Sequence, residues 1–204
     1  MFQIQNEIDL ANAALMRISA GQISDFSEDT DLANIVVTVF PSIIDSLLTQ
    51  YDWQHLRKTV PLQRLAEVPV NGWKYAFAWP VGAITVVRRL LSDATRRESI
   101  VRDFAVEGRT IYSNEQALWG VFGFRLSPDQ WLPALREGAV AALAAAFCVP
   151  VTENLEQAQM LRAEAFGTPQ MNGSGGLIGA AIAMDHAQAN ARVPSSAAAH
   201  YWMD

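Results

Sequence analysis

Apolar residues in the first fifty positions recur with the spacing of amphipathic helices. The first series repeats every three or four residues through Ile4, Ile8, Ala11, Leu15 and Ile18. Gly21 follows, and glycine commonly ends a helix because it tolerates left-handed backbone conformations. The pattern predicts a first helix over residues 4–18.

A second helical series follows a polar loop over residues 21–31. Three residues in or next to this loop are candidate N-caps, namely Ser27, Asp29 and Thr30. The apolar face that follows contains Leu32, Val36, Val39, Ile43 and Leu47. Pro41 lies inside this series, and proline removes one amide donor and crowds the preceding turn. Residues 27–50 are therefore predicted to form one bent helix or two short ones.

Short runs rich in β-branched and aromatic residues replace the helical spacing in the middle of the chain. They cover residues 58–65, 74–79, 84–91, 100–106, 110–112 and 118–126, with proline and glycine between them. Gly108, between Glu107 and Arg109, suits the tight turn of a hairpin over residues 102–112. This region is predicted to be a small antiparallel β structure.

Helical patterning returns after residue 126. Ser127 is a candidate cap with Pro128 in the first turn, and an alanine-rich stretch runs to residue 147 and stops before Pro150. Thr152 is the candidate cap of a further helix over residues 153–166, which has Glu153 and Glu156 in its first turn. Residues 167–176 have the composition of a flexible linker, and the alanine-rich residues 177–192 favour a helix.

These elements predict an α+β fold class that is mainly helical. Residues 1–56 and 127–166 would form an antiparallel helix bundle, with residues 57–126 as a small antiparallel β insert. Residues 167–204 would form a linker and an extended C-terminal tail. The tail ends in His200, Tyr201, Trp202 and Met203, and such an aromatic end gains little at a free terminus unless a partner receives it.

Composition and charge narrow the classes of function. The chain has 204 residues, half of them apolar, and a formal charge of −6. Its one cysteine, Cys148, excludes an internal disulfide framework. The N-terminus lacks the basic region of a secretory signal. The apolar run 139–151 is too short to span a bilayer. Residues 1–56 carry one Arg against eight acids, residues 57–136 twelve Lys and Arg against seven, and residues 137–204 two against six. The overall negative charge argues against a protein dedicated to binding duplex DNA. The uneven distribution of charge along the chain suits contacts with oppositely charged partners or with other copies of this chain. Chance variation between segments explains this distribution equally well.

No constellation of residues points to catalysis, a metal or a cofactor. The three histidines have no metal-ligand spacing, and Cys148 fits a buried structural thiol better than a nucleophile. The glycine-rich residues 173–179 lack the context of a phosphate-binding loop, and the acidic residues 25–31 lack the glycine and glutamate of a calcium loop. The densest basic cluster consists of Arg88, Arg89, Arg96, Arg97 and Arg102. It is interpreted as a charged strand edge, a protein-docking patch or a surface near phosphates, in that order of preference.

Several local sequences, taken in order, resemble one family of virion proteins. They lie at residues 8–15 with 23–24, 40–48, 51–58, 73–80, 106–112 and 141–152, within a span of about residues 4–166. In this order they resemble the tail tubular protein A, or head-to-tail adaptor, family of short-tailed bacteriophages and gene-transfer particles. Trp53, Tyr75, Phe77 and Pro80 match aromatic and proline positions of that family and are assigned to packing.

The resemblance implies a structural virion protein at the head-tail junction, made in the host cytoplasm. It implies a ring of twelve copies between the portal protein and the tail nozzle protein, which prolongs the channel for genomic DNA without binding that DNA specifically. The free chain is expected to be a monomer, with no membrane and no cofactor involved. The resemblance also suggests portal binding by the tail residues His200, Tyr201, Trp202 and Met203. Two alternatives from other classes are a tail-associated hydrolase of the cell envelope and a small DNA-binding or partner-binding module of a packaging machine.

Overall fold

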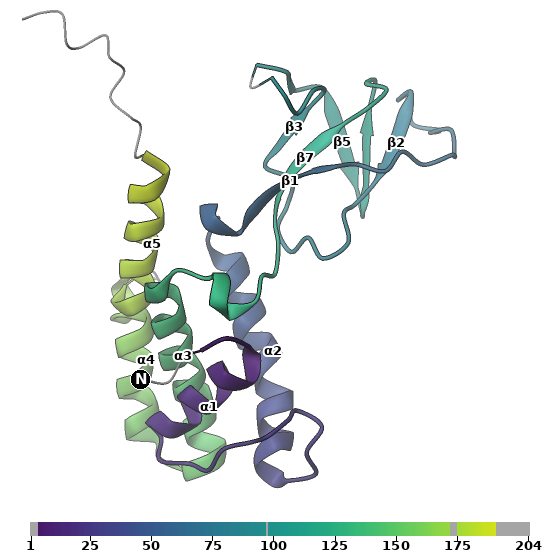
Figure 1. The fold of residues 1–204 in the computed structure, drawn as a ribbon. Helices are drawn as coiled ribbons and strands as arrows, with labels where there is room; N and C mark the ends of the chain where they lie inside the picture. The colour runs from purple at the N-terminus through teal and green to yellow at the C-terminus, as the bar shows by residue number, and fades with distance from the viewer. Residues whose placement is uncertain (1–3, 97, 172–174, 191–204) are drawn as a thin grey trace, which may run out of the picture. The chain divides into compact units, whose positions relative to one another are not determined.

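A computed structural model describes residues 4–96, 98–171 and 175–190. Within these residues the fold is mixed α+β, with five α-helices and two small antiparallel sheets (Figure 1). The chain divides into two compact units. The helical unit comprises residues 1–47 and 127–204 as far as they are described, and the β unit comprises Leu48–Leu126. These units divide the chain after Leu47 and after Leu126, whereas the segments predicted from the sequence divide it after residues 56 and 126.

The first helix, α1 (Glu7–Arg17), is set by its caps. Asn6 Oδ1 accepts a hydrogen bond from the amide of Asp9 at 2.8 Å, and Asp9 Oδ2 accepts one from the amide of Asn6 at 3.2 Å. This reciprocal capping box satisfies amides that the first turn leaves free. The predicted start at residue 4 is thus wrong by three residues, and the chain leaves the helix at Ser19, which has a φ of 56°, before it reaches Gly21.

Helix α2 (Asp31–Gln50) is a single helix with Pro41 inside it. Thr30, one of the three candidate caps, accepts a hydrogen bond on Oγ1 from the amide of Ala33 at 3.2 Å. Of the two predicted alternatives, one bent helix or two short ones, the structure has the single helix, with the Pro41 side chain exposed. The buried side of α2 includes Val36 and Ile44, and the exposed side carries polar residues.

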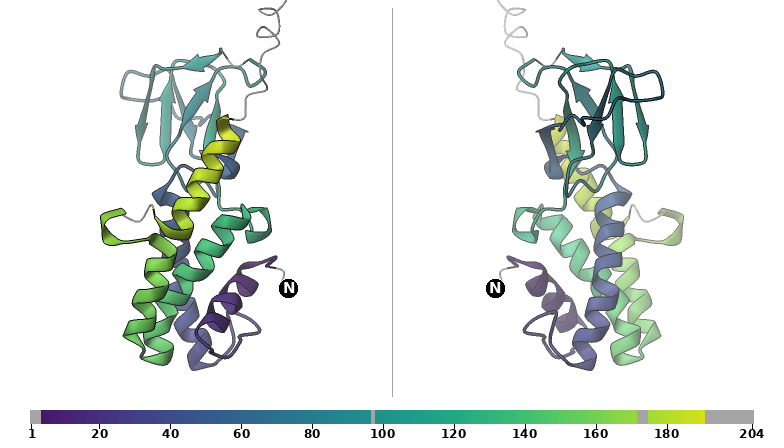
Figure 2. Two further views of the ribbon diagram at one scale, coloured as in Figure 1. Left: turned by 90° about the vertical axis from the view of Figure 1, so that its left-hand side faces the viewer. Right: turned by 90° about the vertical axis from the view of Figure 1, so that its right-hand side faces the viewer.

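Helix α3 (Pro133–Thr152) is the centre of the helical unit, since α1, α4 (Leu155–Phe166) and α5 (Gly176–Asn190) all pack against it (Figure 2). Its start differs from the prediction, because Pro128 begins only the short 3₁₀ helix η2 (Pro128–Gln130). Its end also differs, because Pro150 lies inside the last turn, where its side chain is exposed.

The turn from α3 to α4 also corrects the predicted cap. Thr152 is the last residue of α3, and its hydroxyl donates to the carbonyl of Cys148 at 2.7 Å. Glu153 takes a left-handed conformation with a φ of 55°, and Asn154 is the N-cap of α4, accepting from the amide of Gln157 at 3.0 Å. An asparagine side chain is a better cap than a threonine that is already engaged within the preceding helix.

The predicted linker is a close-packed turn where it is described. The amide of Gly175 donates to the carbonyl of Phe166 at 3.1 Å, and Gly175 is buried. Gly176 has a φ of +57°, and a Cβ there would lie 2.3 Å from the carbonyl oxygen of Glu164. Residues 172–174 and 191–204 lie outside the described part. The prediction of an extended tail falls on these last residues, so it stays a prediction. Helix α5, however, belongs to the helical unit, because it packs against α3 and α4.

Two helices of the described chain, α2 and α3, are 20 residues long and apolar enough in composition to cross a membrane. The run 139–151 is short, as noted from the sequence, but the helix that contains it begins at Pro133. Ten residues of α3 are buried by its neighbours, and α2 is amphipathic, with Asn34, Thr38 and Asp45 exposed. Both helices therefore also fit the packing of a folded helical unit.

The β unit is built from two sheets that share one core. The first sheet has the order β1-β7-β3-β4, formed by β1 (Arg57–Pro61), β7 (Trp119–Gly123), β3 (Arg89–Leu91) and β4 (Ile100–Val101). The second has the order β2-β6-β5, formed by β2 (Tyr75–Ala78), β6 (Thr110–Ser113) and β5 (Phe104–Glu107). The predicted run 84–91 is a strand only at its end, and the run 100–106 splits into β4 and β5.

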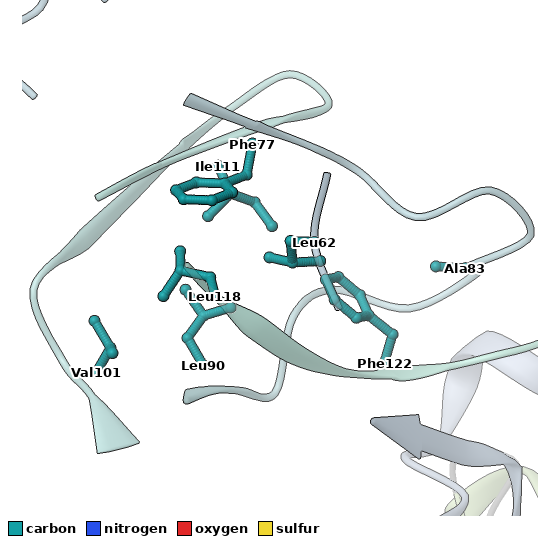
Figure 3. Packing of buried hydrophobic residues seen from close by; sticks show 8 residues of the cluster. All are labelled: Leu62, Phe77, Ala83, Leu90, Val101, Ile111, Leu118 and Phe122. Carbon is teal, nitrogen blue, oxygen red and sulfur yellow. The ribbon is translucent and has the colours of Figure 1, made fainter. Parts of the chain in front are cut away.

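The core of the β unit lies between the inner faces of these sheets (Figure 3). The first sheet contributes Leu90, Val101 and Phe122, and the second contributes Phe77 and Ile111. The hairpin predicted over residues 102–112 is confirmed for β5 and β6, which are joined through Gly108 at a φ of +58°. The glycine turn is the local signal from which this hairpin is predicted.

Two glycines with nearly equal φ allow a test of the close packing at the start of α5. Gly176 and Gly108 have φ values of +57° and +58°, but a Cβ at Gly108 would meet nothing within 4 Å. An alanine at either position must adopt the left-handed backbone conformation, which destabilises the fold by about 1–2 kcal/mol. Gly176→Ala should cost at least about 1 kcal/mol more than Gly108→Ala, because backbone atoms of residues 164–167 cannot move aside cheaply. Urea unfolding followed by circular dichroism measures both, and equal losses would contradict the packing described here.

Candidate functional site

The best-defined polar cluster of the β unit joins Asp52, Arg57 and Arg88. Asp52 Oδ1 accepts a hydrogen bond from Arg57 Nε at 3.1 Å and forms an ion pair with Arg88 Nε at 3.0 Å. Arg57 Nη2 also pairs with Asp52 Oδ2, and Arg57 Nη1 donates to Gln54 Oε1 at 3.1 Å. The Asp52 side chain is 26% exposed, so the three groups form a partly shielded charge cluster.

This cluster joins the neighbouring residues Asp52 and Arg57 to Arg88, which is distant from both in sequence. Asp52 follows α2, Arg57 opens β1, and Arg88 directly precedes β3. The two arginines thus hold the segment at residue 52 next to the starts of β1 and β3 within the β unit. The sequence analysis did not single out Asp52, although it lies in the 51–58 segment that carries part of the family resemblance, because nothing along the chain indicates a pairing with Arg88 thirty-six positions later.

The basic cluster predicted from the sequence does not act as one set of free cations. Arg88 forms an ion pair with Asp52. Arg96 Nε lies 3.6 Å from Asp93 Oδ2, and the Arg96 side chain is 72% exposed. Arg89 is an exposed residue of β3, opposite Val121 of β7, and Arg102 is exposed after β4. Arg97 lies outside the described residues. The interpretation as a charged strand edge does not fit Arg89, because β3 pairs with β7 on one side and with β4 on the other. Arg88 has a structural partner in Asp52.

Arg102 lies at a shallow, open hollow of about 410 Å³. Its lining includes Glu98, Asp103 and Glu115 as well as Ser99. Three carboxylates beside one guanidinium give this hollow an acidic balance, which disfavours phosphate binding by Arg102.

The acidic loop before α2 is organised by serines. The Ser27 hydroxyl donates to Asp25 Oδ1 at 2.6 Å and the Ser24 hydroxyl to Glu28 Oε2 at 2.8 Å, and each serine amide donates to the same carboxylate. These hydrogen bonds lower the pKa of Asp25 and the pKa of Glu28 below their ordinary values. The loop therefore remains negatively charged at neutral pH, and its carboxylates serve local turns.

Cys148 lies in a polar contact at the end of α3. Its thiol donates to the carbonyl oxygen of Asn154 at 3.3 Å and lies 3.4 Å from Thr152 Oγ1, and the residue is fully buried. These contacts agree with the interpretation of a structural thiol.

Among the described residues no group of three or more His, Cys, Asp or Glu is placed to hold a metal ion. The four tail residues His200, Tyr201, Trp202 and Met203 lie outside the described part.

Net charge separates along the boundary of the two units. The helical unit, counted over residues 1–47 and 127–204, has 4 Lys and Arg against 14 Asp and Glu, a net charge of −10. The β unit has 11 against 7, a net charge of +4, and the two sum to the −6 of the whole chain. The uneven charge along the sequence therefore gives each unit a net charge of its own sign. Net charges of opposite sign on two units can orient a charged protein partner.

Comparison with other proteins adds no family assignment. Neither a protein-family model nor a curated protein matches the sequence.

Asp52→Asn tests the charge cluster of Asp52, Arg57 and Arg88 within the β unit. The neutral amide keeps the shape of the side chain but leaves two guanidinium groups without a charged partner, so we expect a loss of about 1–2 kcal/mol in the free energy of unfolding. Arg96→Ala, which removes an exposed ion pair, is the matched control and should change stability by less than about 0.5 kcal/mol. Chemical denaturation followed by tryptophan fluorescence measures both, and similar effects would show that Asp52 has no special role.

Proposed function

We propose that this chain is a structural virion protein, a head-to-tail adaptor that forms a ring between the portal protein and the tail nozzle protein. The ring would prolong the channel through which genomic DNA passes without specific binding. The helical unit would act as an antiparallel bundle, and the C-terminal residues as an extended tail. The observation that carries the proposal is the ordered set of family-like sequences over residues 4–166, which is independent of the structure.

The architecture agrees with the proposal at a coarse level. A helical unit assembled from both parts of the chain, interrupted by a β unit at Leu48–Leu126, is the arrangement that the resemblance implies. The pairing of Arg88 with Asp52 weighs against the DNA-binding alternative, because it removes one arginine from the cluster that would contact phosphates.

The charge of the helical unit gives the proposal a mechanical component. A body with a net charge of −10 repels a polyanion. If its acidic surface faces the channel, DNA can slide past without adhering, because no counterions are released from its phosphates. The acidic loop at Asp25 and Glu28 contributes to this charge under all conditions near neutral pH, since hydrogen bonds hold the pKa of both groups low.

The portal experiment tests the proposal as a whole. The purified chain is mixed with its cognate portal ring, and the product is imaged by electron microscopy. We expect an additional ring of density at the tail-facing end of the portal, with one copy for each portal subunit. An unrelated acidic protein of similar size is the control, and portal rings that remain bare at saturating concentrations of the chain would refute the adaptor function.

The tail experiment tests where portal affinity resides. Truncation after Asn190 keeps α5, which packs against α3 and α4, and removes only residues 191–204. We expect at least a tenfold loss of portal affinity, which corresponds to about 1.4 kcal/mol. The full-length double variant Tyr201→Ala/Trp202→Ala should lose most of the same affinity, because aromatic side chains supply most of the apolar area that such a short segment can bury. Undiminished binding by both variants would remove the tail from the portal contact.

A further inference from the structure

The loop that leads into β2 contains an exposed Asn-Gly pair. Asn71 and Gly72 are both exposed, and so are Val68 and Val70 on the same loop. Gly72 has a φ of +88°, and a Cβ there would meet no atom within 4 Å. The missing side chain of Gly72 therefore leaves the peptide bond between the two residues accessible.

The side chain of Asn71 joins this loop to the hairpin of β5 and β6. Its Nδ2 donates a hydrogen bond to Glu107 Oε1 at 3.2 Å, although the two residues are 36 positions apart. Glu107 is the last residue of β5 and is itself exposed. The contact depends on the amide of Asn71, because a carboxylate in its place has no proton to donate and would bring two negative charges together.

We propose that Asn71-Gly72 is a site of spontaneous deamidation and that this modification releases the loop from the hairpin. In the reaction the backbone nitrogen of Gly72 bonds to Cγ of Asn71, and the bond from Cγ to Nδ2 breaks. The proton of the Gly72 amide leaves with the Nδ2 group as ammonia, and a five-membered succinimide remains. Water then opens this ring, so residue 71 becomes aspartate or isoaspartate.

The residue after the asparagine decides how readily the ring closes. A side chain on that residue crowds the approach of its nitrogen to Cγ and restricts the backbone, whereas glycine does neither. Asn114 in the same unit is also exposed, but it is followed by Glu115. Asn71 therefore converts faster than Asn114. A second Asn-Gly pair, at residues 172 and 173, lies outside the described residues.

The modification changes both a contact and a charge of the β unit. A new carboxylate at residue 71 changes the balance of 11 Lys and Arg against 7 Asp and Glu to 11 against 8, a net charge of +3. The carboxylate lies beside Glu107, so the two groups repel one another where a hydrogen bond joined them. The inference is independent of the head-to-tail function, because it concerns one loop within the β unit.

Mass spectrometry of the aged protein tests the reaction. The folded full-length chain is incubated at neutral and at mildly alkaline pH, digested with trypsin and compared with fresh protein digested in parallel. Asn71 falls in the peptide 65–74, Asn114 in the peptide 110–125, and the second Asn-Gly pair in neither. We expect Asn71 to convert at least about tenfold faster than Asn114, and faster at the higher pH, because ring closure requires the nitrogen of Gly72 to lose its proton.

Asn71→Gln is the matched control for this experiment. It keeps an amide at residue 71 but would have to close a six-membered ring, so conversion of the peptide 65–74 should slow at least about tenfold. A peptide 65–74 that stays unmodified in the folded chain while it converts in urea would show that the fold protects the site, and this would overturn the proposal. Conversion no faster than that of Asn114 would overturn it as well.

Hydrogen exchange tests the release of the loop. Asn71→Asp reproduces the aspartate product, and Asn71→Asp/Glu107→Gln keeps that carboxylate but places a hydrogen-bond donor opposite it. Exchange in residues 65–74 should be about two to five times faster in the single variant, as expected for an exposed contact, and should return to the wild-type rate in the double variant. Equal rates in the wild type and the single variant would refute the release of the loop.

Discussion

The burial of α3 is the constraint on which the helical unit depends. This helix is apolar in most of its 20 residues, with Leu135, Val140, Leu143 and Phe147 all buried, and so wide an apolar surface must be packed against several neighbours. The cover comes from α1 near the N-terminus and from α4 and α5 near the C-terminus. The two parts of the chain must therefore meet around α3, and the residues between them are left to fold as a separate β unit.

Small residues make this arrangement possible. Gly138 of α3 lies so close to α5 that an added Cβ would stand 2.5 Å from Ile178 Cδ1, and alanines fill the adjoining positions. Gly176 at the start of α5 is equally confined, with backbone atoms where a side chain would be. Glycine composition alone favours the interpretation of a flexible linker over residues 167–176, but here several of the glycines serve close contact between segments. Composition does not distinguish these two uses of glycine, since both follow from the missing side chain.

The sequence predicted those features of the fold that are local. The amphipathic series of α1 and α2, the cap at Thr30 and the hairpin at Gly108 depend on residues a few positions apart, and the structure contains all of them. Helix ends were less predictable, because Asn6 and Asn154 compete with other plausible caps nearby, and the deciding hydrogen bonds are seen only in three dimensions. The pairing of Asp52 with Arg88 could not be foreseen, since the register of β3 beside β7 brings the two residues together and no pattern along the chain encodes that register. For the same reason the basic cluster was read as one patch, although its members belong to different strands and loops.

Charge separation and edge protection together limit how copies of this chain can meet. Two helical units with a net charge of −10 repel one another, and two β units with a net charge of +4 do so as well, so charge favours contacts in which the helical unit of one copy meets the β unit of another. Within the β unit, three sheet edges are blocked by proline, by a covering segment or by shortness, and this leaves β5 as the edge with free backbone groups.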